Sequence, residues 1–278
     1  MTNSNKQRKL WQRKIALPSD HGSWVFLLAP LLAGFFIGGR WSAASLLLTV
    51  AALAVFLLRQ PAAMIVKAYS GRRSRKDLPA ALFWFGLYAM AGAAAVAGLV
   101  WQGYSYILWL GVPGIFVFSW HLWLVSRREE RRRMGVDILA SGALALAAPA
   151  AYWVSIGEPA LTGWWLWGLL WFQTAASIVY AFLRLEQRVL KESPSKKARW
   201  RMGRRALAYA SFNLLASILI ASLGWQPKLL WLPYLVQWLE VVWGITHPAV
   251  GAKPTQIGWR QLVVSTLFTI LFIFAYSV

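Results

Sequence analysis

The sequence of 278 residues contains no cysteine, and it has only nine acidic residues and three histidines. A chain without cysteine has no disulfide framework, no thiolate metal site and no cysteine nucleophile. It also contains no G-x-x-x-x-G-K-[ST] phosphate loop, no G-x-G-x-x-G turn beside a strand and no serine nucleophile elbow. These absences exclude several enzyme classes and leave few side chains for acid–base chemistry or metal binding.

The three histidines do not predict a metal site. His21, His121 and His247 stand in or directly beside three different hydrophobic segments, and no His-x-x-x-His pair is present. Zinc sites are usually recognised by closely spaced His and Cys ligands, which this chain lacks. We therefore predict no metal site, and the sequence does not identify a cofactor.

Hydrophobic residues are abundant, at 59% of the chain, whereas charged residues make up only 14%. Soluble domains have about half apolar and about a quarter charged residues. A bilayer-spanning helix needs about 20 mostly apolar residues. The segments that meet this length are roughly 22–39, 41–58, 79–101, 104–126, 134–156, 160–183, 206–225, 228–246 and 258–277. The sequence thus predicts an all-α integral membrane protein with nine transmembrane helices.

The basic residues are distributed unevenly between the two sides of these segments. Of the 29 Lys and Arg residues, all except Arg40 and Lys228 fall in the N-terminal arm or after the second, fourth, sixth and eighth segments. Loops rich in Lys and Arg remain in the cytoplasm. We therefore expect a cytoplasmic N-terminus and a C-terminus on the outer side.

This pattern also defines the expected organisation of the chain. Residues 1–21 form a cytoplasmic basic amphipathic arm in which Leu10, Trp11 and Ile15 lie in the membrane interface. Residues 22–278 form a single nine-helix transmembrane domain. The expected cytoplasmic loops are about 59–78, 127–133, 184–205 and 247–257.

The formal net charge of +20 has a simple explanation in these loops. Basic residues close to a membrane surface attract anionic lipid headgroups, at roughly 1 kcal/mol each. Because the charge is confined to one side of the predicted spans, we expect membrane lipids rather than nucleic acid as partners. The sequence does not identify a protein partner.

Polar residues inside the spans carry the functional information, because each is costly in lipid and tends to face the bundle interior. In three spans they repeat every three or four residues and so share one helical face. All of them lie in the half of the span nearer the basic loops. The candidate cavity-lining residues are Gln173, Ser177, Tyr180, Tyr209, Asn213, Gln237, His121 and Asp137. We interpret them as the walls of a polar cavity entered from the cytoplasm; interhelical packing is the alternative.

Four residues are candidates for acid–base catalysis: Glu240, His247, His21 and Asp20. Glu240 is the one acid deep inside a predicted span, and with His247 it can act as a base or a proton carrier. The alternative is that burial neutralises Glu240, or that an arginine pairs with it. The sequence does not decide between them.

Two stretches of the chain resemble the YwiC-like family of bacterial membrane proteins. The first is Pro18–Trp24 (PSDHGSW), followed by Pro30 and Ala33-Gly34. The second is Gly244–Pro248 (GITHP) with the Lys253-Pro254 pair after it. The resemblance implies a multi-pass protein of the bacterial inner membrane, and no biochemical activity comes with it.

The predicted layout is also similar, more distantly, to that of the UbiA-type prenyltransferases. The resemblance implies two Asp-rich motifs, in the connections after spans two and six, where Mg²⁺ bridges carboxylates to an isoprenoid diphosphate. Here the first connection, Lys67–Asp77 (KAYSGRRSRKD), has one acid, and the second has Glu186 and Glu192. Both motifs are missing, which argues against Mg²⁺-dependent prenyl transfer, and Mg²⁺ is not expected.

Basic residues in these connections can hold an anion directly, since Arg and Lys bind phosphate groups without a metal. The residues expected to do so are Lys67, Arg72, Arg73 and Arg184. The sequence thus predicts a UbiA-like scaffold that binds an isoprenoid phosphate or another anionic lipid headgroup. The alternative is a non-enzymatic protein, either a small-solute transporter or a membrane accessory subunit.

Overall fold

The computed structural model describes residues 13–18, 21–71, 75–127 and 134–278. Within these ranges every regular element is helical. The longer helices are α3 (His21–Gly38), α4 (Ala43–Tyr69), α5 (Leu78–Trp101), α6 (Leu108–Ser126), α7 (Met134–Ala145), α8 (Ala147–Ile156), α9 (Leu161–Arg188), α10 (Lys196–Ser222), α11 (Trp231–Thr246) and α12 (Pro254–Ser277). Three short elements accompany them: α2 (Arg13–Ala16) and the 3-10 turns Arg75–Asp77 and Ser105–Ile107. Counting α7 and α8 together, the nine predicted segments correspond to nine helices.

Seven of the described helices are long and apolar enough to cross a membrane. They correspond to α4, α5, α6, α7 with α8, α9, α10 and α12. The apolar helix at Gly22–Gly38 is shorter, and α11 has 16 residues. By length and hydropathy the chain is therefore a multi-pass membrane protein.

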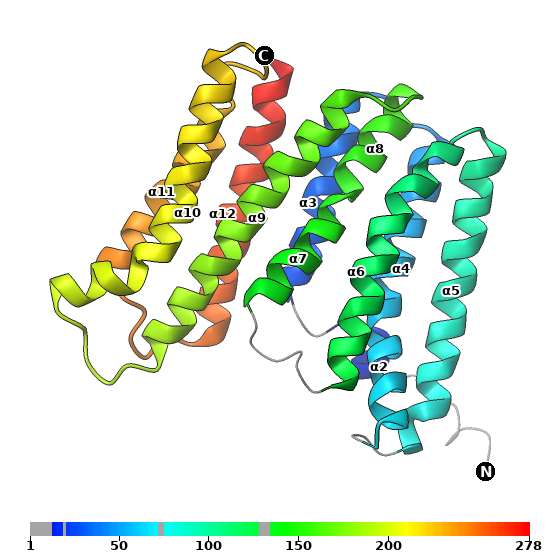
Figure 1. Cartoon of the computed structure of the whole chain (residues 1–278), viewed down its shortest axis with the longest axis horizontal. Helices are drawn as coiled ribbons and strands as arrows, with labels where there is room; N and C mark the ends of the chain where they lie inside the picture. Colours follow the sequence, from blue (N-terminus) through cyan, green and yellow to red (C-terminus); the bar gives the residue numbers. More distant parts are fainter. Residues whose placement is uncertain (1–12, 19–20, 72–74, 128–133) are drawn as a thin grey trace.

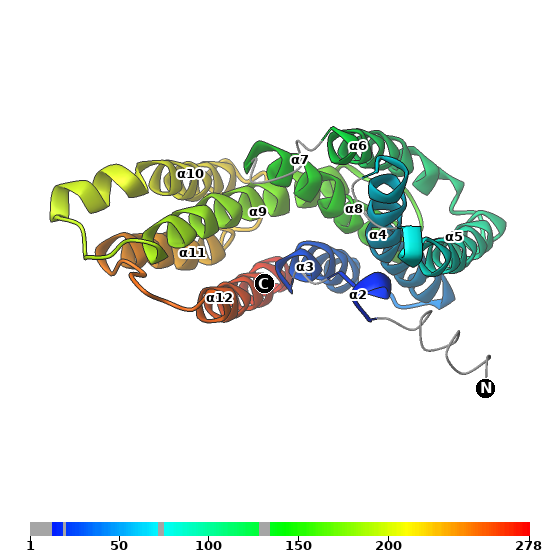
Figure 2. The same cartoon turned by 90° about the horizontal axis from the view of Figure 1, so that it is seen from below.

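The helices run alternately up and down and form a flattened bundle (Figures 1 and 2). Seen from below, α9 and α10 lie opposite α11 and α12, while α4, α5 and α6 occupy the other end (Figure 2). Helix α3 packs against both α8 and α12 and thereby joins the two parts. The ends of α4, α6, α9 and α11 lie together at the bottom in Figure 1. We call this the basic end, because the predicted basic loops follow these helices.

Small residues allow close helix crossings in the first part of the bundle. A Cβ atom at Gly34 of α3 would collide with the carbonyl oxygen of Ala148, and one at Gly38 would collide with Ser155. Two glycines four residues apart let the backbones of membrane helices approach closely. The glycines therefore determine how tightly α3 packs on α8.

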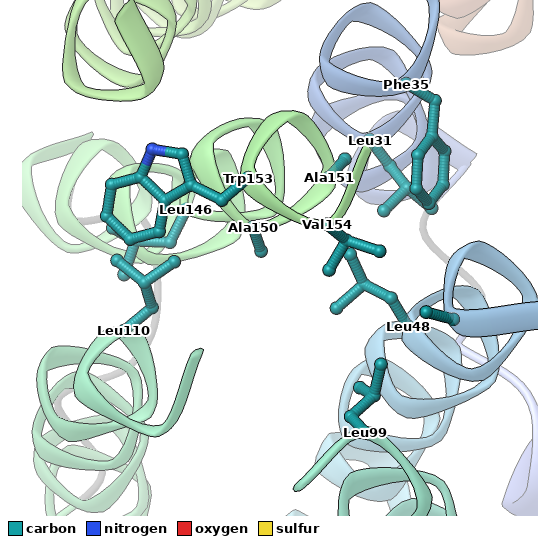
Figure 3. Close-up of a cluster of buried hydrophobic side chains, with 11 residues drawn as sticks. Leu31, Phe35, Leu48, Leu99, Leu110, Leu146, Ala150, Ala151, Trp153 and Val154 are labelled. Atoms are coloured by element: carbon teal, nitrogen blue, oxygen red, sulfur yellow. The ribbon is translucent and has the colours of Figure 1, made fainter. Parts of the chain in front are cut away.

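A cluster of buried hydrophobic side chains lies beside this crossing (Figure 3). Leu31 and Phe35 come from α3, Val154 from α8, Leu48 from α4 and Leu99 from α5. In Figure 3 these side chains converge on the space between the four helices. Apolar packing thus joins helices that are far apart in the sequence.

Pro149 interrupts the fifth predicted span, which is divided into α7 and α8. The ring of Pro149 has no N–H to donate to the carbonyl of residue 145, and α7 ends at Ala145. At the break the backbone N–H of Leu146 donates to Ala143 O rather than to Gly142 O, and the indole N–H of Trp167 donates to Gly142 O at 2.9 Å. By contrast, α3 and α6 continue through Pro30 and Pro113.

Two of the predicted cytoplasmic loops are much shorter in the structure. Helix α4 extends to Tyr69 and α9 to Arg188, while α10 already begins at Lys196. Most of the predicted loops 59–78 and 184–205 is therefore helical. The apolar length of a span shows where the membrane core ends, but Lys, Arg and Gln favour helix nearly as well as Leu, so the helix continues.

The end of the N-terminal arm packs against protein. Ile15 is fully buried beside Met64 and Trp84, and the hydroxyl of Tyr88 donates to Ala16 O at 3.0 Å. Ile15 is therefore covered by α4 and α5, and its expected place in the membrane interface stays a prediction. Leu10 and Trp11 lie outside the described residues.

A candidate anion pocket between α9, α11 and α12

One buried acid, Glu240, is paired with an arginine at the basic end of α9, α11 and α12. Arg260 of α12 forms a bidentate ion pair with the Glu240 carboxylate: Nε donates to Oε1 at 2.6 Å and Nη2 donates to Oε2 at 2.7 Å. The hydroxyl of Tyr180 on α9 also donates to Glu240 Oε1, at 2.8 Å. Glu240 is therefore an ion-paired carboxylate with both oxygens engaged, which is the arginine-paired alternative rather than a free base.

Arg184 has a different set of partners from Arg260. Its Nη1 donates to Gly244 O at 2.8 Å, His247 O at 2.7 Å and the side-chain oxygen of Gln187 at 3.0 Å. The last carbonyls of a helix lack intrahelical partners, and a cation near them is favourable. Arg184 therefore caps the C-terminus of α11 with one nitrogen.

Gly244 lets α9 come close enough for these bonds. A Cβ atom at this position would collide with the phenol ring of Tyr180. Arg199 of α10 caps the same helix end, donating from Nη1 to Thr246 O at 2.8 Å. The C-terminus of α11 is thus held by arginines from two neighbouring helices.

These residues surround a pocket with a volume of about 330 Å³. Its lining includes Arg184, Glu240, Arg260, Gln256 and Gln261. The ring of Trp243 forms one wall, with the guanidinium carbon of Arg260 3.4 Å and that of Arg184 5.4 Å from its centroid. Both guanidinium groups are close enough to the indole ring for cation–π attraction.

The charges in this pocket do not balance. Within the described residues, Glu240 forms an ion pair with Arg260, and no acid lies within ion-pair distance of Arg184. Arg184 is nevertheless only 7% exposed, and its other partners are carbonyl and amide oxygens. The pocket therefore carries one uncompensated positive charge.

A packed polar layer lies next to the pocket, toward the middle of the bundle. Gln237 donates from Nε2 to Gln173 O at 2.9 Å and to Ser177 Oγ at 3.1 Å. Gln173 donates to the same hydroxyl at 3.1 Å. Tyr234 and Phe268, which belong to a buried apolar cluster, follow in the same direction. Together these side chains pack the interior between α9, α11 and α12 on the side of Glu240 away from the basic end.

The remaining predicted cavity residues lie elsewhere. Asn213 is buried and donates to Phe172 O at 2.8 Å, so it joins α10 to α9. Tyr209 is 43% exposed on α10. His121 is on α6 and the exposed Asp137 is on α7, neither of which contributes to the lining of this pocket.

The structure also separates the predicted catalytic and anion-binding residues. His247 is exposed beyond the end of α11, where its ring stacks on Trp243 with centroids 5.0 Å apart. Lys67 is on α4, which packs against α5, α6 and α8 rather than against the helices around Arg184. Asp20, Arg72, Arg73 and the side chain of His21 lie outside the described residues.

Residues 17–152 match the model of a protein family described as YwiC-like protein. This stretch, just under half of the chain, is similar to that family. No curated protein and no solved structure matches the chain. The YwiC-like part extends from just before α3 into α8, so the pocket between α9, α11 and α12 lies outside it. The Pro18–Trp24 motif falls inside the match, and Gly244–Pro248 falls outside.

Sequence reasoning missed Arg260, Trp243 and the two glutamines of α12. Arg260 was counted among the basic residues after the eighth segment, although it lies inside the predicted span 258–277, four residues after Gln256 on the same helical face. An arginine in the first turns of a span, with one deep acid in the preceding span, was the available signal. Among the described residues, no group of three or more His, Asp or Glu side chains is close enough to hold a metal.

Proposed function

We propose that this multi-pass membrane protein binds an anionic lipid headgroup, such as an isoprenoid phosphate, in the pocket between α9, α11 and α12. The observation that carries the proposal is the buried, uncompensated charge of Arg184. A buried charge without an ionic partner is costly. A bound phosphate group would supply the missing negative charge.

The donors that remain available fit this ligand. Arg184 uses only Nη1 for protein contacts, and Arg260 binds Glu240 through Nε and Nη2. The other guanidinium N–H groups, with the amides of Gln256 and Gln261, can donate to phosphate oxygens. Direct pairing with arginine requires no Mg²⁺.

The position of the pocket favours a lipid over a soluble anion. Trp243 and Ile257 give it apolar walls, and Trp243 is partly exposed at the surface of α11. In the expected orientation this end faces the cytoplasm, at the headgroup level of the bacterial inner membrane. The lipid tail would leave the pocket sideways, along the apolar surface of α11 and α12.

The packed interior supports binding rather than transport. A transporter needs a path that continues to the other side. Here Gln173, Gln237, Tyr234 and Phe268 fill the space next to the pocket. We therefore retain a UbiA-like, non-catalytic scaffold as the proposal, with the transporter or accessory subunit as the alternative.

The test is binding of a short-chain isoprenyl diphosphate to the purified protein, measured by isothermal titration with and without EDTA. Arg184→Gln should weaken binding by roughly 1.5–3 kcal/mol, or about ten- to a hundredfold, because a hydrogen-bonded charge contact is lost. Arg199→Gln is the matched control, since Arg199 caps the same helix but does not line the pocket. Its affinity should be that of the wild type.

Three outcomes would contradict the proposal. Equal loss in both variants would mean that the helix end, not the pocket, matters for binding. Loss of binding in EDTA would indicate a metal-bridged site. No binding under either condition would favour the transporter or accessory-subunit alternative.

A further inference from the structure

A second hollow of about 190 Å³ lies on another side of α9, between α7, α9 and α10. We call it the α10 groove. It contains Phe182 and Glu186 of α9, each two residues beyond Tyr180 and Arg184. Two residues correspond to about 200° of rotation on a helix, so the groove and the first pocket face nearly opposite sides of α9.

The rim of the α10 groove is strongly basic. Arg201, Arg204 and Arg205 come from one stretch of α10, and all three are exposed. Glu186 is the one acid in the lining, and no ion pair joins it to these arginines in the described structure. The groove therefore has a net charge of about +2.

The inner wall of the groove is apolar. Phe182, Met202 and Met134 line it, and Leu183 and Ala206 connect it to the buried cluster between α9, α10 and α11. A cationic rim above an apolar wall matches a phospholipid, whose phosphate lies at the membrane surface and whose acyl chains lie beside it. Basic pockets between membrane helices bind such headgroups.

We propose that the α10 groove is a binding site for an anionic phospholipid, with preference for one that carries two phosphate groups. The charge of the rim is the reason for this preference, since two phosphates balance it and one does not. Arg201 and Arg205, one helical turn apart, contact the phosphates. The site is independent of the pocket that contains Arg184.

The experiment is native mass spectrometry of the purified protein with added cardiolipin, phosphatidylglycerol or phosphatidylcholine. The double variant Arg201→Gln/Arg205→Gln should bind cardiolipin less tightly, by about fivefold for each arginine, because each basic contact near the phosphates is lost. The matched control is Lys196→Gln/Lys197→Gln, which removes the same charge from the exposed first turn of α10. The control should bind cardiolipin as the wild type does.

The same variants are also measured in an Arg184→Gln background, so that the result does not depend on the first pocket. A selective loss in the arginine variant, with cardiolipin bound more tightly than phosphatidylglycerol, supports the proposal. An equal loss in both double variants overturns it, because the attraction would then be non-specific. No loss in either variant, or equal binding of phosphatidylcholine, also overturns it.

Discussion

Arg184 and Arg260 have the same charge but different surroundings. Arg260 is paired with Glu240 and stacks on Trp243, whereas Arg184 binds only neutral oxygens within the described chain. The difference follows from helix positions: α12 places Arg260 opposite Glu240, and α9 places Arg184 at the end of α11. At the residue scale, Arg184 is therefore the group that most requires an external anion.

Gly244 controls how closely Tyr180 approaches α11. We expect Gly244→Ala to destabilise the protein by about 1–3 kcal/mol, the usual cost of overpacking, because the added Cβ displaces the phenol ring from Glu240. Thermal unfolding in detergent measures this. The same variant should also weaken isoprenyl diphosphate binding, since Glu240 loses the hydroxyl that holds it in place beside Arg260.

Gly168→Ala on α9 serves as the control for Gly244→Ala. Nothing lies within 4 Å of a Cβ at Gly168, so this change should be neutral or slightly stabilising. If Gly244→Ala unfolds at the same temperature as Gly168→Ala, the close contact with Tyr180 has no energetic importance.

At the scale of elements, α9 organises the second half of the bundle. Its polar residues Gln173, Ser177, Tyr180 and Arg184 are all buried and face α11. The residues between them line the α10 groove on another face. One helix thus separates two polar regions, because its faces alternate with the helical period.

In the YwiC-like part, the backbones of α3 and α8 cross closely at Gly34. Gly34→Ala should lower stability by about 1–3 kcal/mol, because the new Cβ meets backbone that cannot rotate away. Gly86→Ala on α5, where a Cβ meets open space, is the control. If the two variants unfold at the same temperature, α3 can move away from α8 without a loss of stability, and the prediction is wrong.

At the scale of the whole molecule, the two hollows lie at the same end of the bundle, near the ends of α9 and α11 and the start of α10. If this end faces the cytoplasm, a reporter placed within residues 191–200 should be cytoplasmic. A reporter fused after Val278 should be on the outer side. A cytoplasmic signal from the C-terminal fusion would show that the expected orientation is wrong.

Much of the fold could be predicted because hydrophobicity acts residue by residue. Each apolar segment of about 20 residues forms a helix in lipid whatever its neighbours are. Loop lengths could not be predicted in this way, as α4 and α9 show, because helix formation continues into polar residues. The burial of Ile15 could not be predicted either, because it depends on α4 and α5, which cover this residue and come later in the chain.

The sequence by itself determined the membrane class, the helical segments, the uneven charge and the polar faces that contain Gln173, Gln237 and Glu240. Spacing and solvation cost are enough for these, since both are properties of a single helix. The tertiary structure decided that Arg260 pairs with Glu240, that Arg184 caps α11 and that Lys67 lies apart from both. Arg184 and Gly244 are 60 residues apart. Such partners depend on which helices pack together, and the pattern within one helix does not contain that information.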